Sequence, residues 1–344
     1  PPGSVRLFDA HHSAAAGMSL DNLKRDLQPA NGARAQGRAP VLPPAMQFSE
    51  FARRYEEHAA AYGEREAAWL AGFEGARPTP LPYDRPRTPF ATNHAGHVSW
   101  TLPSPLAGRI RELGRRHGTT PFMTLAAGVL ATLHRTTGQD DLVIGISSSG
   151  RPFDGADSVV GHCVEVLPVR SRVDAGTGTQ RFLKQVRGWL LDAYESEVFT
   201  WGRLHEKLDR PRDPSAAPLI AVEINMEPAA SVEAASRRAF AGMELEPVKR
   251  VSAPSTRWDI HVDAVDAGDR IVLHTIYNAD LLERATVERI LAQMERVLEQ
   301  ITDGDDLPLS RLELAAEERS PLDEWNRTAT RYPADACVHR MFEA

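Results

Sequence analysis

The sequence has very little cysteine and no long hydrophobic run. Its two cysteines, Cys163 and Cys337, are too few and too far apart for a disulfide framework or a cysteine-based metal site, which fits a reducing compartment. No apolar run approaches the roughly 18 residues that a membrane span needs, and no signal peptide is recognisable. With a net charge of -7, the chain has no electrostatic case for nucleic acid as a partner. We therefore expect a cytoplasmic protein that binds neither membrane nor nucleic acid.

What is present is the composition of a globular protein. Of 344 residues, 42% are hydrophobic and 25% are charged, which suffices for one large or two medium domains. Helical spacing of apolar residues predicts helices over 19–27 and 47–73, separated by an irregular segment over 29–44. Five prolines between residues 76 and 89 exclude regular structure there and indicate a connection between larger units.

From Gly96 onward the sequence has a well-punctuated α/β pattern. Thr120 followed by Pro121 is typical of a helix start, and Gly118 and Gly138 are typical helix ends. A Gly-containing turn near residue 268 predicts a hairpin. The expected strands are at 98–100, 142–146, 164–170, 219–226, 258–265 and 270–277, and the expected helices are at 104–117, 121–137, 180–197 and 285–302.

Paired histidines close to the start of the chain form the most distinctive stretch. Apolar residues over 5–8 predict a buried strand, which leads into His11 and His12, three alanines from 14 to 16, and Gly17, which can supply an unusual turn. Histidine is readily poised as an acid or a base near neutral pH. From these residues alone, a structural pair is the favoured interpretation, with one imidazole buried and bonded to backbone and the other in solvent.

Several segments together resemble the condensation domains of nonribosomal peptide synthetases. Residues 11–17 match the motif His-His-x-x-x-Asp-Gly except at Ala16. The form Gly161-His-Cys-Val164 is most similar to condensation domains of hybrid polyketide-peptide assembly lines. Further segments that resemble family motifs follow in the family's order at 120–125, 138–145, 149–151, 160–164, 167–170, 212–219, 224–226 and 277–281. Residues 322–343 resemble the linker into an adenylation domain and that domain's first residues.

The resemblance implies an α/β fold with two lobes, like that of chloramphenicol acetyltransferase. We expect residues 1–95 to hold the rest of an N-terminal lobe, residues 96–318 to form the C-terminal lobe, and residues 319–344 to lead into an adenylation domain. Family members have a substantial segment before the paired histidines, whereas only a few residues precede them here. The expected N-terminal lobe is therefore incomplete, either because the chain is cleaved or truncated or because the rest is supplied elsewhere.

The resemblance also implies the reaction. The amine of an acceptor aminoacyl thioester would attack a donor acyl or peptidyl thioester and form an amide bond. Both substrates would be held on the phosphopantetheine arms of carrier proteins, and the domain itself would bind no cofactor and no metal. The partners would be an upstream donor carrier, a downstream acceptor carrier and the adjacent adenylation domain.

Residue roles follow the matched motifs. His12 is the expected base or stabiliser of the charged intermediate, and His11 is expected to be structural. Ser19 and Asn225 are expected to bind substrate, although Asn225 could equally be a strand residue that satisfies local backbone. Arg151 is the expected partner of the aspartate that Ala16 replaces. If Arg151 is buried, loss of that partner costs about 3–5 kcal/mol unless another acceptor is present.

Other histidine and cysteine residues carry less weight in this interpretation. We expect His162 and Cys163 to be core or supporting residues, because the reaction needs no covalent enzyme intermediate.

A second hypothesis is a condensation-like domain without catalytic activity that docks carrier proteins or tailoring partners. Ala16 and the missing leading segment favour it. Epimerisation and heterocyclisation domains fit less well, because the former lack such an exit into an adenylation domain and the latter have Asp-x-x-x-x-Asp at the paired histidines.

Overall fold

The structure, a computed structural model, describes residues 10–90, 92–208, 218–227 and 254–314, together with positions 327, 328, 339 and 342. The strand predicted over residues 5–8 lies outside the described residues, as does nearly all of the segment predicted to enter an adenylation domain.

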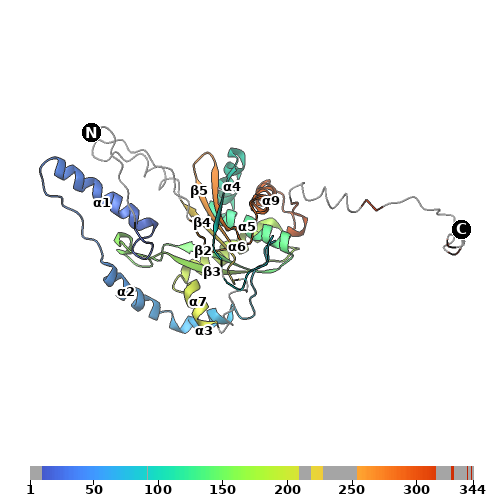
Figure 1. The fold of residues 1–344 in the computed structure, drawn as a ribbon, viewed down its shortest axis with the longest axis horizontal. Helices are drawn as coiled ribbons and strands as arrows, with labels where there is room; N and C mark the ends of the chain where they lie inside the picture. The colour runs from blue at the N-terminus through green and yellow to red at the C-terminus, as the bar shows by residue number, and fades with distance from the viewer. Residues whose placement is uncertain are drawn as a thin grey trace.

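A mixed six-stranded sheet forms the centre of the molecule (Figure 1). Its strand order is β1-β6-β5-β4-β2-β3, and the neighbours are antiparallel except for the parallel pairs β2–β4 and β4–β5. A left-handed Gly268 (φ +85°) lies in the turn between β5 and β6 and confirms the predicted hairpin. The strands are β1 (Ala95–Leu102), β2 (Asp141–Ser148), β3 (Glu165–Arg172), β4 (Val222–Glu227), β5 (Ile260–Asp266) and β6 (Ile271–Asn278).

Four helices cover one face of the sheet and bury the main core: α4 (Ser104–His117), α5 (Pro121–Thr137), α6 (Thr179–Glu195) and α9 (Arg284–Thr302). Helix α5 starts as predicted, since the Thr120 hydroxyl accepts a hydrogen bond from the Met123 N–H, and it ends at a left-handed Gly138. Gly128 lets α9 approach closely, because a Cβ there would lie 2.6 Å from Leu298 Cδ2. The helix predictions from residue 104 onward are confirmed.

The first part of the chain differs from prediction in two places. Helix α1 (Gly17–Ala35) continues through Pro29, where an irregular segment was expected to begin. A proline interior to a helix removes one hydrogen bond, and here the following residues still complete the helix before the left-handed Gly37. The helix expected over 47–73 is two helices, α2 (Phe48–Ala60) and α3 (Gly63–Ala71), because Ala61 and Tyr62 donate to carbonyls only three residues back, which tightens the turn between them.

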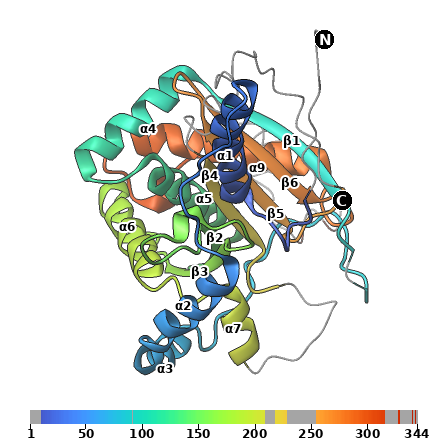
Figure 2. The same ribbon diagram turned by 90° about the vertical axis from the view of Figure 1, so that its left-hand side faces the viewer.

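Helix α1 lies on the side of the sheet opposite α5 and α9 (Figures 1 and 2). It contacts a short 3₁₀ helix, η1 (Ala156–Ser158), in the loop between β2 and β3. The residues from Phe73 to Leu81 pack on the sheet and on α7 (Trp201–Lys207), and Thr79 is fully buried with its hydroxyl at Val143. The proline-rich connection is thus irregular, as predicted, and firmly packed.

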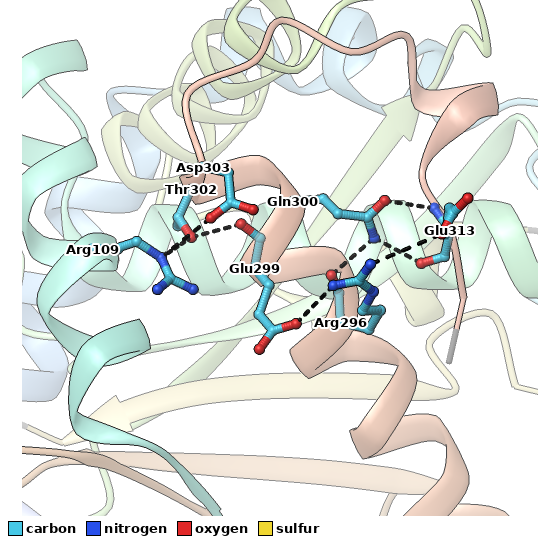
Figure 3. A network of polar contacts seen from close by, with 7 residues as sticks. All are labelled: Arg109, Arg296, Glu299, Gln300, Thr302, Asp303 and Glu313. Atoms are coloured by element: carbon cyan, nitrogen blue, oxygen red, sulfur yellow. Dashed lines mark hydrogen bonds and ion pairs between the residues drawn. The ribbon is translucent and has the colours of Figure 1, made fainter. Parts of the chain in front are cut away.

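Polar contacts fix the position at which the chain leaves the sheet domain (Figure 3). The Gln300 side chain accepts from the Glu313 N–H at 2.8 Å and donates to the Glu313 carbonyl at 2.7 Å, so it pairs with that backbone as a neighbouring strand would. Arg296 adds an ion pair to the Glu313 carboxylate at 3.9 Å. Gln300 and Arg296 lie on α9. At the end of that helix, the Thr302 hydroxyl accepts a hydrogen bond from Arg109 of α4 at 3.1 Å.

Candidate functional site

The paired histidines lie in an exposed turn immediately before α1. The Ala14 and Ala15 N–H groups both donate to the His11 carbonyl, which closes the turn. His11 Nδ1 accepts from the Ser13 N–H at 3.2 Å and lies 2.7 Å from the Ser13 hydroxyl. The His11 ring is therefore engaged within its own loop, which suits the structural role predicted for it. The His12 ring has no hydrogen bond recorded to any described residue.

The first turns of α1 are bonded to the loop after η1. The Ser19 hydroxyl donates to the Gly161 carbonyl at 2.8 Å and accepts from the Gly161 N–H at 3.0 Å. Asn22 Nδ2 donates to the carbonyls of Asp157 and Val159. Ser19 is fully buried, so a substrate would meet its hydroxyl only after these bonds break. The substrate-binding role of Ser19 remains a prediction.

Arg151 is buried beside this junction without the carboxylate partner that the family motif implies. One guanidinium nitrogen, Nη1, donates to the carbonyls of Ala156 and Val159. The Nε and Nη2 groups are buried and have no partner among the described residues. Because the Val159 carbonyl also accepts from Asn22, the guanidinium lies against the start of α1. Ala16 is also buried, at 7% exposure, and its methyl group cannot accept a hydrogen bond.

Gly17 does not make the unusual turn that the sequence suggested. It is the first residue of α1, and its φ is not positive, unlike that of eight other described glycines. A Cβ at this position would meet no described atom within 4 Å. The helix begins at Gly17 with ordinary geometry because Ala16, in extended conformation, already provides the change of direction.

The ring of His12 packs against that of His162, which directly follows Gly161. The ring centroids are 4.7 Å apart and the planes meet at 63°, an edge-to-face arrangement. Partial burial, and then the charges of His12 and Arg257, lower the pKa of His162. Of the two roles expected for His162, a core residue is excluded because its side chain is exposed, and a supporting role is compatible with its contact to His12. The Gly-His-Cys-Val motif was the available signal.

Cys163 has the character expected of a packing residue. Its side chain is buried at 3% exposure and packs with Phe51, Ala156 and Val159. Burial raises the pKa of the thiol, so it stays protonated and is a poor nucleophile.

Asn225 lies on β4, on the sheet face turned away from the helical core. Its Nδ2 donates to Asp263 Oδ1 at 3.1 Å. On the same face, the buried carboxylate of Glu223 accepts from the Ser147 hydroxyl and pairs with His261. Side chains alternate along a strand, so the residues between these, such as Ile224 and Val262, point into the core. The sequence analysis missed Glu223 and His261. A cross-strand pair of this kind becomes visible only when the register is known.

Two further observations concern ligands and membranes. Within the described ranges, no group of three or more His, Cys, Asp or Glu side chains is placed to hold a metal ion. No helix in the part of the chain that the structure describes is long and apolar enough to cross a membrane.

The fold and the paired-histidine loop are those of a condensation domain. The family model of the condensation domain matches residues 3–321, and the chain belongs to this family. The condensation domains of nonribosomal peptide synthetases form peptide bonds.

Relatives are peptide synthetases. The chain is 29% identical over 98% of its length to a linear gramicidin synthase of Brevibacillus parabrevis, and 27% identical over 98% of its length to a surfactin synthase of Bacillus subtilis. A probable non-canonical nonribosomal peptide synthetase of Salinispora arenicola is 32% identical over 90% of the chain. The chain spans 7%, 9% and 4% of the lengths of these three relatives.

Solved structures share the fold. The X-domain from teicoplanin biosynthesis is 24% identical, with a TM-score of 0.74 over 89% of this chain and 70% of that one. The same X-domain has been solved in complex with OxyB (24% identity, TM-score 0.73, over 89% of this chain and 68% of that one). The first condensation domain of the CDA synthetase has a TM-score of 0.67 at 19% identity, over 89% of this chain and 65% of that one. These likenesses confirm the predicted fold class, the chloramphenicol acetyltransferase-like condensation fold.

Proposed function

We propose that this chain catalyses amide-bond formation between a donor acyl or peptidyl thioester and the amine of an acceptor aminoacyl thioester. The observation that carries the proposal is the exposed imidazole of His12, in a turn before α1, within a chain that matches the condensation-domain family over nearly its whole length. Both substrates would arrive on phosphopantetheine arms of carrier proteins, and an adenylation domain of the same synthetase would load the acceptor carrier.

The reaction requires the protein to position the two substrates and to supply one group that transfers a proton. A free amine is already a nucleophile, so holding it near the thioester carbonyl supplies much of the acceleration. In the step, the C–N bond forms and the C–S bond breaks. His12 takes the proton that the attacking amine loses and returns it to the departing thiolate. His11, whose ring is bonded to Ser13, would keep the loop in shape.

In this proposal, Asn225 takes part in substrate orientation. It is partly exposed on the polar face of the sheet, and its bond to Asp263 fixes which way the amide points. Its carbonyl oxygen is then available as an acceptor toward that face, where an amide N–H of a substrate could donate.

The test uses the full-length synthetase that contains this domain. Donor and acceptor carriers are loaded, and the transfer is followed by intact-protein mass spectrometry in a single turnover. We expect His12→Ala to slow transfer by about 10²-fold or more, and His11→Ala to slow it less. Carrier binding, measured separately, should be unchanged in both variants. Transfer at the parental rate in His12→Ala would remove His12 from the mechanism.

A second candidate function, a docking domain without catalytic activity, is favoured by two observations. The Nε and Nη2 groups of Arg151 are buried without a partner among the described residues, where the family motif implies a carboxylate. The fold is also shared with an X-domain that has been solved in complex with OxyB. The same assay separates the two candidates. No product from the parent with both carriers loaded, together with measurable binding of a carrier or tailoring partner, supports docking.

A further inference from the structure

The His12 ring rests on a side chain that comes from a distant part of the chain. Its recorded contact within the described residues is the edge-to-face packing on His162, with ring centroids 4.7 Å apart. Rotamer preference restricts the side-chain torsions of an exposed histidine to a few staggered wells. The packing against His162 restricts the direction of the His12 imidazole further.

The backbone that carries His162 is held on both sides. On one side, Gly161 exchanges two hydrogen bonds with the buried Ser19 hydroxyl, and the Phe48 ring covers it so closely that a Cβ would lie 2.1 Å from Phe48 Cδ2. On the other side, Cys163 is buried, and its carbonyl fits against Gly150, where a Cβ would lie 1.7 Å from that oxygen. His162 is thus an exposed ring on a fixed support.

The charged groups around His162 act in the same direction. His12 faces it from the loop before α1, and Arg257 faces it from the segment before β5. Both carry positive charge when protonated, and the nearby Glu165 interacts with Arg257. Partial burial comes first, and the positive charges of His12 and Arg257 then add to it, so that the pKa of His162 is lowered.

We infer that His162 is a positioning residue for His12: its ring sets the direction of the His12 imidazole. This inference rests on the proposed function insofar as it concerns rate. The contact itself can be tested without any activity.

The first measurement is made on this chain alone. Histidines are labelled with ¹³C and ¹⁵N, and the His12 ring resonances are assigned with His12→Gln. An aromatic edge-to-face contact shifts the resonances of the packed ring, so His162→Ala should move the His12 resonances toward those of a free histidine. His162→Phe, which keeps a ring at the same place, should largely retain the shift. Unchanged His12 resonances in His162→Ala would overturn the inference whatever the enzyme does.

The second measurement is the single-turnover transfer assay. We expect His162→Ala to lower the rate on the order of tenfold through misorientation, with the carrier concentration dependence unchanged. His162→Phe, which keeps a ring at the same place, should restore most of that rate. A parental rate in His162→Ala, or no recovery of rate in His162→Phe, would overturn the inference. If instead His12→Ala is fully active, His12 leaves the proposed mechanism while the resonance test still decides the contact.

Discussion

The two sides of the His12–His162 contact are held very differently. On the His162 side, Gly161 and Cys163 are both buried, and hydrogen bonds to Ser19 and a tight fit against Gly150 restrain the backbone. On the His12 side, residues 10–14 are exposed and the turn is closed by bonds to His11 alone. The difference supports the inference that the His12 ring takes its direction from the loop between β2 and β3.

Ala16 bears on the connection between these two sides. In the family motif an aspartate stands at this position, and we expected Arg151 to be its partner. Here the guanidinium is satisfied at Nη1 by two backbone carbonyls of the fixed loop and is without a partner at Nε and Nη2 among the described residues. Arg151 therefore still bonds to the loop that carries His162. The expected ion pair with a carboxylate at position 16, next to the His12 loop, is missing.

The largest expected effect comes from breaking the fixed side with Gly150→Ala. The added Cβ would lie 1.7 Å from the Cys163 carbonyl oxygen, and the backbone has a φ of +62°. We expect a loss of unfolding free energy of at least about 3 kcal/mol, because backbone on both sides must move. Urea denaturation measures it.

The matched control is Gly118→Ala, which has a similar φ of +65° and no atom within 4 Å of the new Cβ. The left-handed conformation alone should cost about 1–2 kcal/mol there. Equal losses in the two variants would mean that the close approach of Gly150 to Cys163 contributes nothing.

Ser19→Ala should have the next largest effect, because it leaves the N–H and the carbonyl of buried Gly161 without their partner. We expect a loss of about 2 kcal/mol and faster hydrogen exchange at the Gly161 amide. Ser13→Ala, which removes a hydroxyl from the exposed loop, is the control and should change stability little. Protection of the Gly161 amide that persists in Ser19→Ala would show that this side does not depend on the α1 contact.

Ala16→Asp should add an ion pair with Arg151 that connects the His12 loop to the loop that carries His162. A carboxylate that reaches the free edge of the Arg151 guanidinium should raise the unfolding free energy by about 1–2 kcal/mol and increase the transfer rate. Ala15→Asp is the matched control: Ala15 is equally buried, at 8% exposure, and its substitution should destabilise. Loss of stability in Ala16→Asp, with neither slower exchange in the loop nor higher activity, would contradict this account of Arg151.

Much of the fold was predictable because its signals are local. The N-cap at Thr120, the left-handed ends at Gly118 and Gly138, and the hairpin turn at Gly268 depend on residues only a few positions away. The passage of α1 through Pro29 was not predictable in this way, because the neighbouring residues outweighed the proline.

The candidate site was less predictable because its contacts join distant segments. Ser19 and Gly161 are 142 positions apart, and Arg151 turned out to bond backbone carbonyls instead of a side chain. The resemblance to the family identified His12, but no pattern along the chain states that His162 lies against it. The pairing of Glu223 with His261 likewise depends on the register of two parallel strands.

The smallest expected effect is the pH dependence of stability that His162 contributes. Its pKa is lower in the folded protein than in the unfolded chain, where a histidine titrates near about 6.5. The unfolded state therefore binds this proton more readily, so the contribution is complete above the unfolded pKa and is lost as the pH falls from there through the lower folded pKa. Urea denaturation between about pH 5 and pH 8 should show that the parent loses more stability on acidification than His162→Gln does. The difference should be small, because the ring is exposed and screened by solvent. Parallel curves for the two proteins would mean that His162 senses neither partial burial nor the charges of His12 and Arg257, and the contact between the two rings would then be geometric only.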